Sequence, residues 1–300
     1  MSSELVVVIV TYNSVAMIET LLDSLPAALG DVEAEIVVVD NGSSDGTQSA
    51  INERGGCKLV ESTNLGYAAG INRGVAEATD AGAILILNPD VRMTPGAVPA
   101  LLARLCEHDI GIVAPRTEYP DGRLEHSLRR EPTLLRSLGL SRTRRAIFSE
   151  NVNRPEEYAE TRIVDWAVGA ALLVSRECFD AVGGWDESFF LYSEETDFCL
   201  RARDLGYLTV YEPQALVIHY GGGSGRSGKT FAMHEVNRVR LYRRRHGTIA
   251  SLVFLLLSAA RDVFRMLKGD RAEYAVALRA LLCPSRRPVE LGASGRLLPD

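Results

Sequence analysis

The chain has 300 residues, 46% of them hydrophobic, and a formal net charge of -6 at pH 7. A chain of this size and composition can bury a large core, as one α/β unit or as two joined lobes. The negative net charge argues against a general nucleic-acid-binding protein. The five cysteines form no CxxC pair and no metal-ligand spacing, which predicts reduced thiols in a cytoplasmic protein. The N-terminus shows no basic region and no cleavage site of a signal peptide.

The first 115 residues alternate between short apolar runs and helix-like stretches. Uninterrupted β-branched runs predict strands that are buried on both faces. Their alternation with helices predicts an α/β fold with a mostly parallel, doubly wound sheet flanked by helices. The predicted strands are residues 4–10, 34–40, 57–62 and 83–90, with helices over 15–29 and within 64–79.

The second half of the sequence is less regular. Residues 116–165 are arginine-rich and loop-like, and residues 164–175 resemble one buried strand in which Gly169 allows close backbone approach. Residues 208–228 predict a strand, a loop and a flexible glycine-rich segment. From residue 236 the chain predicts basic helices, so we divide it into residues 1–115, 116–235 and 236–300.

Polar side chains stand where several predicted strands end. Ligands of doubly wound sheets bind beyond the carboxyl ends of the strands, and Thr11, Asp40, Asn64 and Asp90 fall there. Asp40 could begin an ordinary turn, with a neighbouring side chain capping the next helix. Alternatively, it could accept hydrogen bonds from a nucleobase or ribose. The first strand is not followed by GxGxxG, which argues against NAD or FAD.

Asp90 and His219 are the candidate metal ligands. Asp90 ends an apolar run in the sequence Asn-Pro-Asp, which is either a turn or a carboxylate presented at the sheet edge. One or two carboxylates together with substrate phosphates usually hold Mg²⁺ or Mn²⁺. His219 ends another predicted strand, and a lone histidine is either structural or a supplementary ligand.

Three acidic residues crowd into the stretch FLYSEETDFCLR at residues 190–201. A helix is predicted to begin there, and the helix macrodipole favours anions at its N-terminus. Asp197 and Arg201 are four residues apart on one helix face, which predicts a structural ion pair. The partner that makes this crowding of Glu194, Glu195 and Asp197 tolerable is a metal, a substrate proton or only the helix N-terminus.

Several motifs occur in one order along residues 5–245: TYN, VVDNGSSDGT, NLGYAAGIN, LNPDV, WAVGAALLV, GGWDESFFLYSEETDFCLR and the glycine-rich loop after His219. In this order they resemble family 2 glycosyltransferases of the GT-A fold, especially bacterial rhamnosyltransferases of cell-wall and surface-polysaccharide synthesis. The resemblance implies a Rossmann-like, mostly parallel sheet flanked by helices. Residues 1–115 would bind the nucleotide sugar, residues 116–235 would bind the acceptor and catalyse transfer, and residues 236–300 would form a helical extension.

The resemblance also implies site roles, position by position. Glu195 would be the catalytic base beside Glu194; relatives commonly have Glu-Asp here, so the base carries one extra methylene. Asp90 would bind Mg²⁺ or Mn²⁺, and His219 would be a further ligand or a diphosphate contact. Asn88 stands where many relatives have the first aspartate of a DxD motif. The donor nucleotide would lie against Thr11, Asn13, Asp40, Asn64, Gly66, Asn72 and Asn88, and the acceptor against Trp166, Trp185 and Asp186.

The implied reaction is an inverting transfer of a sugar, with rhamnose favoured, from a dTDP- or UDP-linked donor. The acceptor would be a hydroxyl of a glycan or of a sugar linked to polyprenyl diphosphate. Two other classes of function are less compatible with the sequence. A nucleotidyltransferase that forms nucleotide sugars would need a glycine- and lysine-rich phosphate loop near the N-terminus, which TYNSVAMIE lacks. A non-catalytic sugar-nucleotide-binding module would lack the acidic residues of the site, whereas Asp40, Asp90 and Glu195 are present.

The C-terminal part combines arginines with the apolar run IASLVFLLLSAA. A run of about a dozen residues is shorter than the ~20 needed to span a bilayer. Two interpretations remain open. The segment is either a soluble helix pair, which could form the interface of a homodimer, or a basic interfacial anchor at the inner face of the cell membrane.

Overall fold

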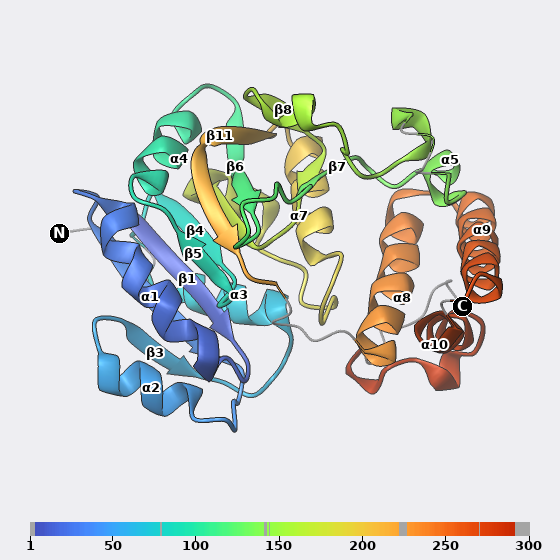
Figure 1. Ribbon diagram of the computed structural model, residues 1–300, viewed down its shortest axis with the longest axis horizontal. Coiled ribbons are helices and arrows are strands. Elements are labelled where there is room, and N and C mark those ends of the chain that lie inside the picture. Colours follow the sequence, from blue (N-terminus) through green and yellow to red (C-terminus); the bar gives the residue numbers. More distant parts are fainter. Residues whose placement is uncertain are drawn as a thin grey trace.

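The computed structural model describes residues 4–78, 80–140, 143, 145–221, 227–269 and 271–291. Its centre is a nine-stranded sheet in the order β3-β2-β1-β4-β10-β6-β11-β5, with β8 beside β11 (Figure 1). These strands are β1 (Leu5–Thr11), β2 (Ala34–Asp40), β3 (Lys58–Glu61), β4 (Ala83–Leu87), β5 (Val91–Met93), β6 (Ile110–Glu118), β8 (Arg162–Val164), β10 (Ala171–Ser175) and β11 (Leu208–His219). The mostly parallel α/β sheet is confirmed.

Helices cover both faces of the sheet because the strands bury side chains on both faces. Leu5, Val7 and Ile9 of β1 pack in one core layer that contains apolar residues of α1 and α4. Val6 and Val8 pack in the opposite layer, which contains residues of α3, α6 and α7. The helices are α1 (Val15–Leu29), α2 (Thr47–Arg54), α3 (Tyr67–Ala76), α4 (Ala97–Leu105), α5 (Leu134–Ser137), α6 (Arg176–Val182), α7 (Glu194–Asp204), α8 (Gly228–Arg245), α9 (Thr248–Leu267) and α10 (Arg271–Leu282).

One antiparallel strand sits inside the parallel sheet. β10 runs antiparallel to both β4 and β6, and Ala171 at its start lies opposite Leu87 at the end of β4. β11 runs parallel to β6 and ends at His219. The beginning of β10 therefore lies at the same edge as the carboxyl ends of β1, β4 and β11.

One strand prediction in the second half was wrong. Residues 164–175 form no single strand: β8 pairs with β11, β9 (Trp166–Ala167) pairs with β7 (Leu128–Arg129), and only β10 joins β4. Strand β11 ends at His219, as predicted, and continues through Pro213, where the register shifts between Glu212 and Leu216. A bulge accommodates a proline because the ladder is already interrupted there.

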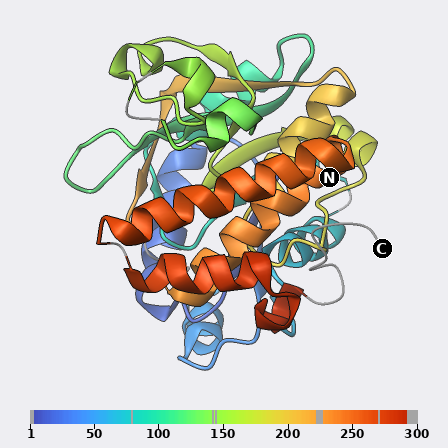
Figure 2. The same cartoon turned by 90° about the vertical axis from the view of Figure 1, so that its right-hand side faces the viewer.

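The last three helices form a separate layer at one end of the molecule (Figures 1 and 2). Their apolar core includes Val236 and Phe254 and packs against Phe190, Leu191 and Tyr192, just before α7. Asn237 of α8 donates from Nδ2 to the carbonyl oxygens of Leu191 (2.9 Å) and Tyr192 (3.2 Å). Helix α8 begins at residue 228, so the expected boundary at residue 236 falls inside it.

Candidate active site

The loops after β1 and β2 are tied to each other by side-chain hydrogen bonds. Asp40 is fully buried and accepts from Thr11 Oγ1 (3.0 Å), the amide of Ser43 (2.9 Å) and Gln48 Nε2 (2.7 Å). Asn13 has a positive φ of 51°, and its Oδ1 accepts from the amide of Ser44 (2.9 Å). The expected nucleotide-pocket residues Thr11, Asn13 and Asp40 thus lie together, and Asp40 anchors the turn of its own loop.

The expected side-chain cap of the next helix is not formed, because the N-cap of α2 is Gly46 and no side-chain hydrogen bond caps it. Asp45 Oδ1 accepts from the amide of Thr47 (3.1 Å) in the first turn of α2. Its Oδ2 accepts from the amide of Val15 (3.1 Å) at the start of α1. Burial raises the pKa of Asp45, but these hydrogen bonds favour the charged carboxylate and together lower the pKa below its ordinary value.

A glycine turn brings α3 against the segment that precedes α7. Gly66 has φ +102°, and a Cβ there would lie 2.5 Å from the carbonyl oxygen of Phe190. The amide of Tyr67 donates to that same oxygen (2.9 Å). Asn64 is exposed and accepts from the amide of Gly66 (3.2 Å) through its Oδ1. Gly66 therefore couples this turn to the segment that leads into α7.

Asn72, expected at the nucleotide, is held by the chain around Trp185. Its Nδ2 donates to the carbonyl of Trp185 (2.8 Å), and its Oδ1 accepts from the amide of Trp185 (2.9 Å). Asn88 is half-buried. Its backbone amide donates to the carbonyl of Ala170 (2.9 Å), and this bond fixes the end of β4 against the start of β10.

Asp90 and His219 meet where β4 and β11 end. His219 Nε2 lies 3.4 Å from Asp90 Oδ1, and its Nδ1 lies 2.9 Å from Glu125 Oε2. Burial alone would lower the pKa of His219, but the hydrogen bonds and charges of Asp90 and Glu125 raise it to about 10. His219 is therefore an imidazolium at neutral pH in the absence of a metal. The glycine-rich loop at residues 222–226 lies outside the described residues.

The residues present fit a divalent cation as a partial site. A carboxylate and an imidazole converge, and Mg²⁺ or Mn²⁺ can complete its coordination with substrate phosphates and water. His219 must lose its extra proton to become a ligand, because only neutral imidazole binds metals. Within the described ranges, no group of three or more His, Cys, Asp or Glu side chains is arranged to hold a metal.

Glu194 and Glu195 open helix α7, as predicted. Glu194 is 3% exposed, and burial followed by the charge of Glu195 raises its pKa well above the ordinary value. Burial also raises the pKa of Glu195, but backbone amides of the helix start, His234 and Arg129 oppose that rise. Burial therefore raises the pKa of both carboxyls, and only Glu195 has nearby positive charges, those of His234 and Arg129, that oppose the rise.

Tyr67 is a site residue that the sequence motifs did not predict. Burial raises its pKa well above the ordinary value, and the nearby charges of Glu194, Glu195 and Asp90 add to the rise. Its hydroxyl also approaches the carbonyl oxygen of Gly169 (3.4 Å). Tyr67 thus lies between the carboxylates of the helix start and that of the sheet edge. Its one sequence signal is a large aromatic residue among the glycines and alanines of GYAAG.

Gly169 lies against the candidate base. A Cβ at this position would be in van der Waals contact, 3.4 Å from Cβ of Glu195. The neighbour of Gly169 is thus a side chain at ordinary contact distance, so the close backbone approach expected at this glycine is not what the structure shows. The backbone before β10 forms one wall beside the glutamate side chain.

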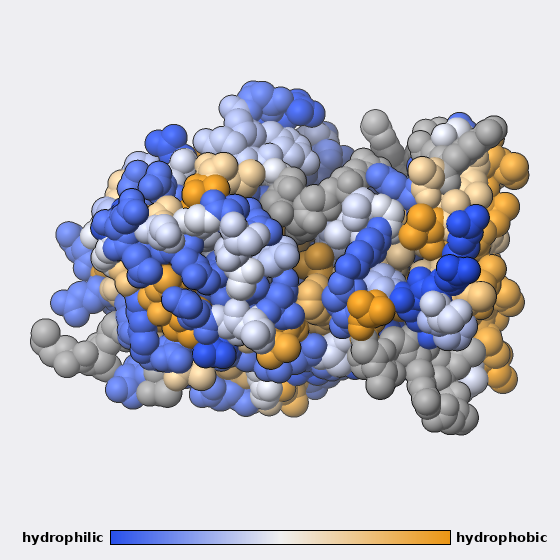
Figure 3. Space-filling view, turned by 90° about the horizontal axis from the view of Figure 1, so that it is seen from below, coloured by the Kyte–Doolittle hydropathy of each residue, from blue (hydrophilic) through white to orange (hydrophobic). Residues whose placement is uncertain are grey.

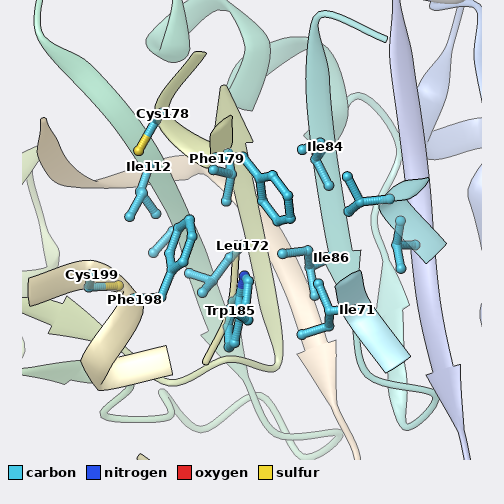
Figure 4. Close-up of a cluster of buried hydrophobic side chains, with 14 of the residues drawn as sticks. Ile71, Ile84, Ile86, Ile112, Leu172, Cys178, Phe179, Trp185, Phe198 and Cys199 are labelled. Atoms are coloured by element: carbon cyan, nitrogen blue, oxygen red, sulfur yellow. The ribbon is translucent and has the colours of Figure 1, made fainter. Parts of the chain in front are cut away.

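The three expected acceptor residues have different surroundings. Trp166 donates from Nε1 to the carbonyl of Arg130 (3.2 Å) and lines the same pocket as Glu195. Trp185 is 2% exposed and stacks on Phe198 with ring centroids 5.2 Å apart, inside the core (Figure 4). The structure therefore does not bring Trp185 to the pocket. Asp186 forms an ion pair with Arg244 of α8.

The third acid of the crowded stretch is structural, as predicted. Asp197 Oδ2 accepts from Nε of Arg201 at 2.6 Å. The guanidinium of Arg201 also donates to the carbonyls of Val182 (2.8 Å) and Gly184 (3.0 Å). This ion pair therefore fixes the turn after α6 to α7.

A pocket of about 290 Å³ opens beside Glu195. This volume is near the lower end of the range for small-molecule sites. Its walls come from the segment 129–151, Trp166, the start of α7, and helices α8 and α9. The lining residues that bear on function are Arg129, Arg136, Trp166, Glu195, His234 and Arg265.

Comparison with known proteins identifies the family. The family model "Glycosyl transferase family 2" matches residues 6–163. An N-acetylglucosaminyl-diphospho-decaprenol L-rhamnosyltransferase of Mycobacterium tuberculosis is 34% identical over 252 residues, which cover 78% of this chain and 81% of that protein. Rhamnosyltransferase WbbL of Escherichia coli is 26% identical over 254 residues, covering 80% of this chain and 92% of the relative.

Solved structures share the fold. A mannosyltransferase from Pyrobaculum calidifontis in complex with GDP-Man and Mn²⁺ aligns with a TM-score of 0.58 at 17% identity, covering 97% of this chain and 82% of that chain. GalNAc-T7 with UDP, GalNAc and Mn²⁺ aligns with a TM-score of 0.60 at 17% identity, covering 80% and 47%. The chain therefore belongs to glycosyl transferase family 2 and is a glycosyltransferase with the GT-A fold, as its motifs predict.

Proposed function

We propose that the protein is an inverting glycosyltransferase that transfers rhamnose from a dTDP- or UDP-linked donor to a sugar carried on polyprenyl diphosphate. The observation that carries this proposal is the position of Glu195, a carboxylate at a helix N-terminus on the wall of a pocket. The similarity to the mycobacterial enzyme supports the choice of rhamnose and of a lipid-linked acceptor.

The reaction is a single displacement at the anomeric carbon of the donor. The acceptor hydroxyl oxygen forms the new bond while the bond to the diphosphate breaks and its electron pair leaves with the nucleoside diphosphate. Glu195 takes the hydroxyl proton. Glu194 lacks the nearby positive charges that favour ionisation of Glu195, so Glu195 is the better placed of the two to act as the base. Attack from the face opposite the leaving group inverts the configuration, and no carboxylate nucleophile is needed.

The test of this function is a direct assay of transfer. The purified protein is incubated with Mn²⁺, a panel of nucleotide sugars and an N-acetylglucosaminyl-diphospho-prenol. Nucleoside diphosphate release and product mass are measured, and NMR gives the anomeric configuration. We expect a single product of inverted configuration from dTDP-rhamnose. A product with retained configuration, or transfer of nucleotide instead of sugar, would contradict the proposal.

Asp90 and His219 would hold a divalent cation, which supplies positive charge against the leaving diphosphate when bound. We expect EDTA to lower turnover to below about one hundredth of the parent rate. Asp90→Ala should abolish the Mn²⁺-dependent rise in melting temperature caused by UDP or dTDP, because that stabilisation follows from ligand binding. His219→Ala should give a partial loss.

Asp31→Ala, which changes an exposed acid in the turn after α1, serves as the charge-matched control. It should leave the response to Mn²⁺ unchanged. Full turnover in EDTA would remove the metal from the reaction.

We also propose that α9 contacts the membrane surface. This helix buries polar residues, among them Ser251, Ser258 and Asp262, and turns an apolar stripe outward. The stripe consists of Ile249, Leu252, Val253, Leu256, Val263, Phe264 and Leu267. Figure 3 shows apolar side chains along this end of the molecule. No helix in the described part of the chain is long and apolar enough to cross a bilayer, so the contact would be interfacial.

Substitution of the stripe tests the membrane contact without uncovering the core of the C-terminal helices. Leu256→Glu combined with Phe264→Glu should abolish cosedimentation with phosphatidylglycerol vesicles at low salt, because the apolar face and its basic neighbours bind together. Leu205→Glu, at an exposed leucine at the end of α7, should sediment like the parent. A parent protein that stays in the supernatant would instead make the stripe a protein contact surface, as in a homodimer.

A further inference from the structure

The pocket at Glu195 has an excess of positive charge. Five arginines line it, against two glutamates, so acids on its own wall cannot neutralise it. Two of the arginines have close acidic partners. Arg238 forms an ion pair with Glu150, and Arg261 forms ion pairs with Glu235 and with Asp262 (2.9 Å). The other three are Arg129, Arg136 and Arg265.

These three arginines make few contacts with acids. Arg129 donates to the backbone carbonyls of His126 and Leu128. Arg136 donates to the carbonyls of Glu131 (2.5 Å) and Ala146 (3.1 Å), and its nearest acid, Asp165, is 4.0 Å away.

Arg265 forms no side-chain hydrogen bond or ion pair with any residue that the structure describes. Taking guanidinium groups out of water without full charge compensation is costly, so a pocket built in this way favours an anionic ligand.

The three arginines lie between the base and an apolar surface. Arg129 is near enough to Glu195 for the two charges to stabilise each other. Arg265 lies on α9 one turn beyond Arg261, and Arg136 lies on α5, which packs against α9 (Figure 2). Leu135, Leu138 and Leu140, which flank the α5 wall, are 44%, 39% and 44% exposed.

The order of chemistry along the pocket is thus a carboxylate base, then cations, then exposed apolar side chains. A sugar diphosphate lipid has the complementary order: a hydroxyl, two phosphates and a hydrocarbon chain. We propose that Arg129, Arg136 and Arg265 bind the diphosphate of a polyprenyl-diphosphate-linked acceptor and that its chain leaves over α5 and α9. The inference rests on the proposed function. Guanidinium groups suit this role because their planar N–H donors match phosphate oxygens.

Two acceptors distinguish this site from a general effect on catalysis. The first is an N-acetylglucosaminyl-diphospho-prenol, and the second is octyl N-acetylglucosaminide, which has the sugar and an alkyl chain but no phosphate. Arg136→Gln and Arg265→Gln should each raise KM for the diphosphate acceptor about tenfold, since each removes a charge-assisted contact. KM for the octyl glycoside and for the donor should stay at the parent values.

Farnesyl diphosphate provides a binding readout. It should inhibit competitively against the octyl glycoside and not against the donor, and its inhibition constant should rise about tenfold in Arg136→Gln. Arg54→Gln removes the same charge from α2, far along the chain from the pocket, and should change none of these constants.

The outcomes distinguish a failure of the proposed function from a failure of the proposed diphosphate site. If the parent transfers sugar to neither acceptor, the proposed function fails. If transfer occurs but the variants raise KM equally for both acceptors, the arginines act through the shape of the pocket and the diphosphate site is wrong. If they raise only KM for the donor, the anion site belongs to the nucleotide.

Discussion

Glu195→Gln should lower turnover at least about a hundredfold while donor binding survives. Glutamine keeps the size of the side chain but cannot accept the proton of the acceptor hydroxyl. Steady-state kinetics measure the loss, and titration calorimetry with the nucleoside diphosphate measures the unchanged affinity. Because burial raises the pKa of Glu195, the parent rate should fall with decreasing pH at a value above the ordinary pKa of glutamate. The base works only above that pKa.

Neighbouring carboxyl groups provide matched controls. Glu194→Gln should retain most activity, because burial favours the neutral form of Glu194 and glutamine resembles the neutral acid. Glu195→Asp should keep substantial activity, since it restores the side chain usual in the family. Asp197→Asn should act mainly on stability through its pairing with Arg201. If Glu194→Gln is inactive while folded and Glu195→Gln turns over normally, the base is assigned to the wrong glutamate.

Gly66→Ala should lower the free energy of unfolding by about 3 kcal/mol, from a left-handed φ combined with overpacking. The added methyl group would meet the backbone of Phe190 at 2.5 Å, and a backbone cannot rotate out of the way as a side chain can. Turnover should fall as well, because Tyr67 and the start of α7 would move apart. Urea denaturation and steady-state kinetics measure the two effects.

Gly30→Ala is the control that separates the effect of the contact with Phe190 from the effect of the backbone conformation. Gly30 has φ +61°, but a Cβ added there would have no atom of the described residues within 4 Å. Only the conformational cost therefore applies, which is about 2 kcal/mol because a ψ of −123° places Gly30 outside the left-handed helical region. Equal losses in the two variants would show that the approach of Gly66 to Phe190 is not tight.

The first half of the fold follows from local pattern. Helix α1 and strand β2 have the predicted bounds, because long apolar runs and an amphipathic repeat define them without distant partners. The segment 164–175 does not follow in this way. Its three short strands have three different pairings, and an apolar run carries no information about which distant strand will pair with it.

The residues of the candidate site likewise fall into those that local sequence can predict and those that depend on distant segments. Glu194, Glu195, Asp90 and His219 stand at element ends that a sequence pattern can place. Tyr67 and Glu125 become site residues only through the folding of distant segments, and neither has a distinctive spacing. Trp185 follows two glycines, as an aromatic residue on a surface turn often does, whereas stacking on Phe198 buries it. Burial by a remote side chain is not visible in local sequence.

Helix α8 joins the C-terminal layer to the segment that leads into α7. Arg240 and Arg244 cover the ring of Phe189 at 5.1 and 4.4 Å, beside the two carbonyls held by Asn237. The segment that leads to the candidate base Glu195 is therefore held by residues that follow this base by some forty positions. A shortened chain that ends before α8 would release this segment and misplace the base, although every residue of the family motifs would still be present.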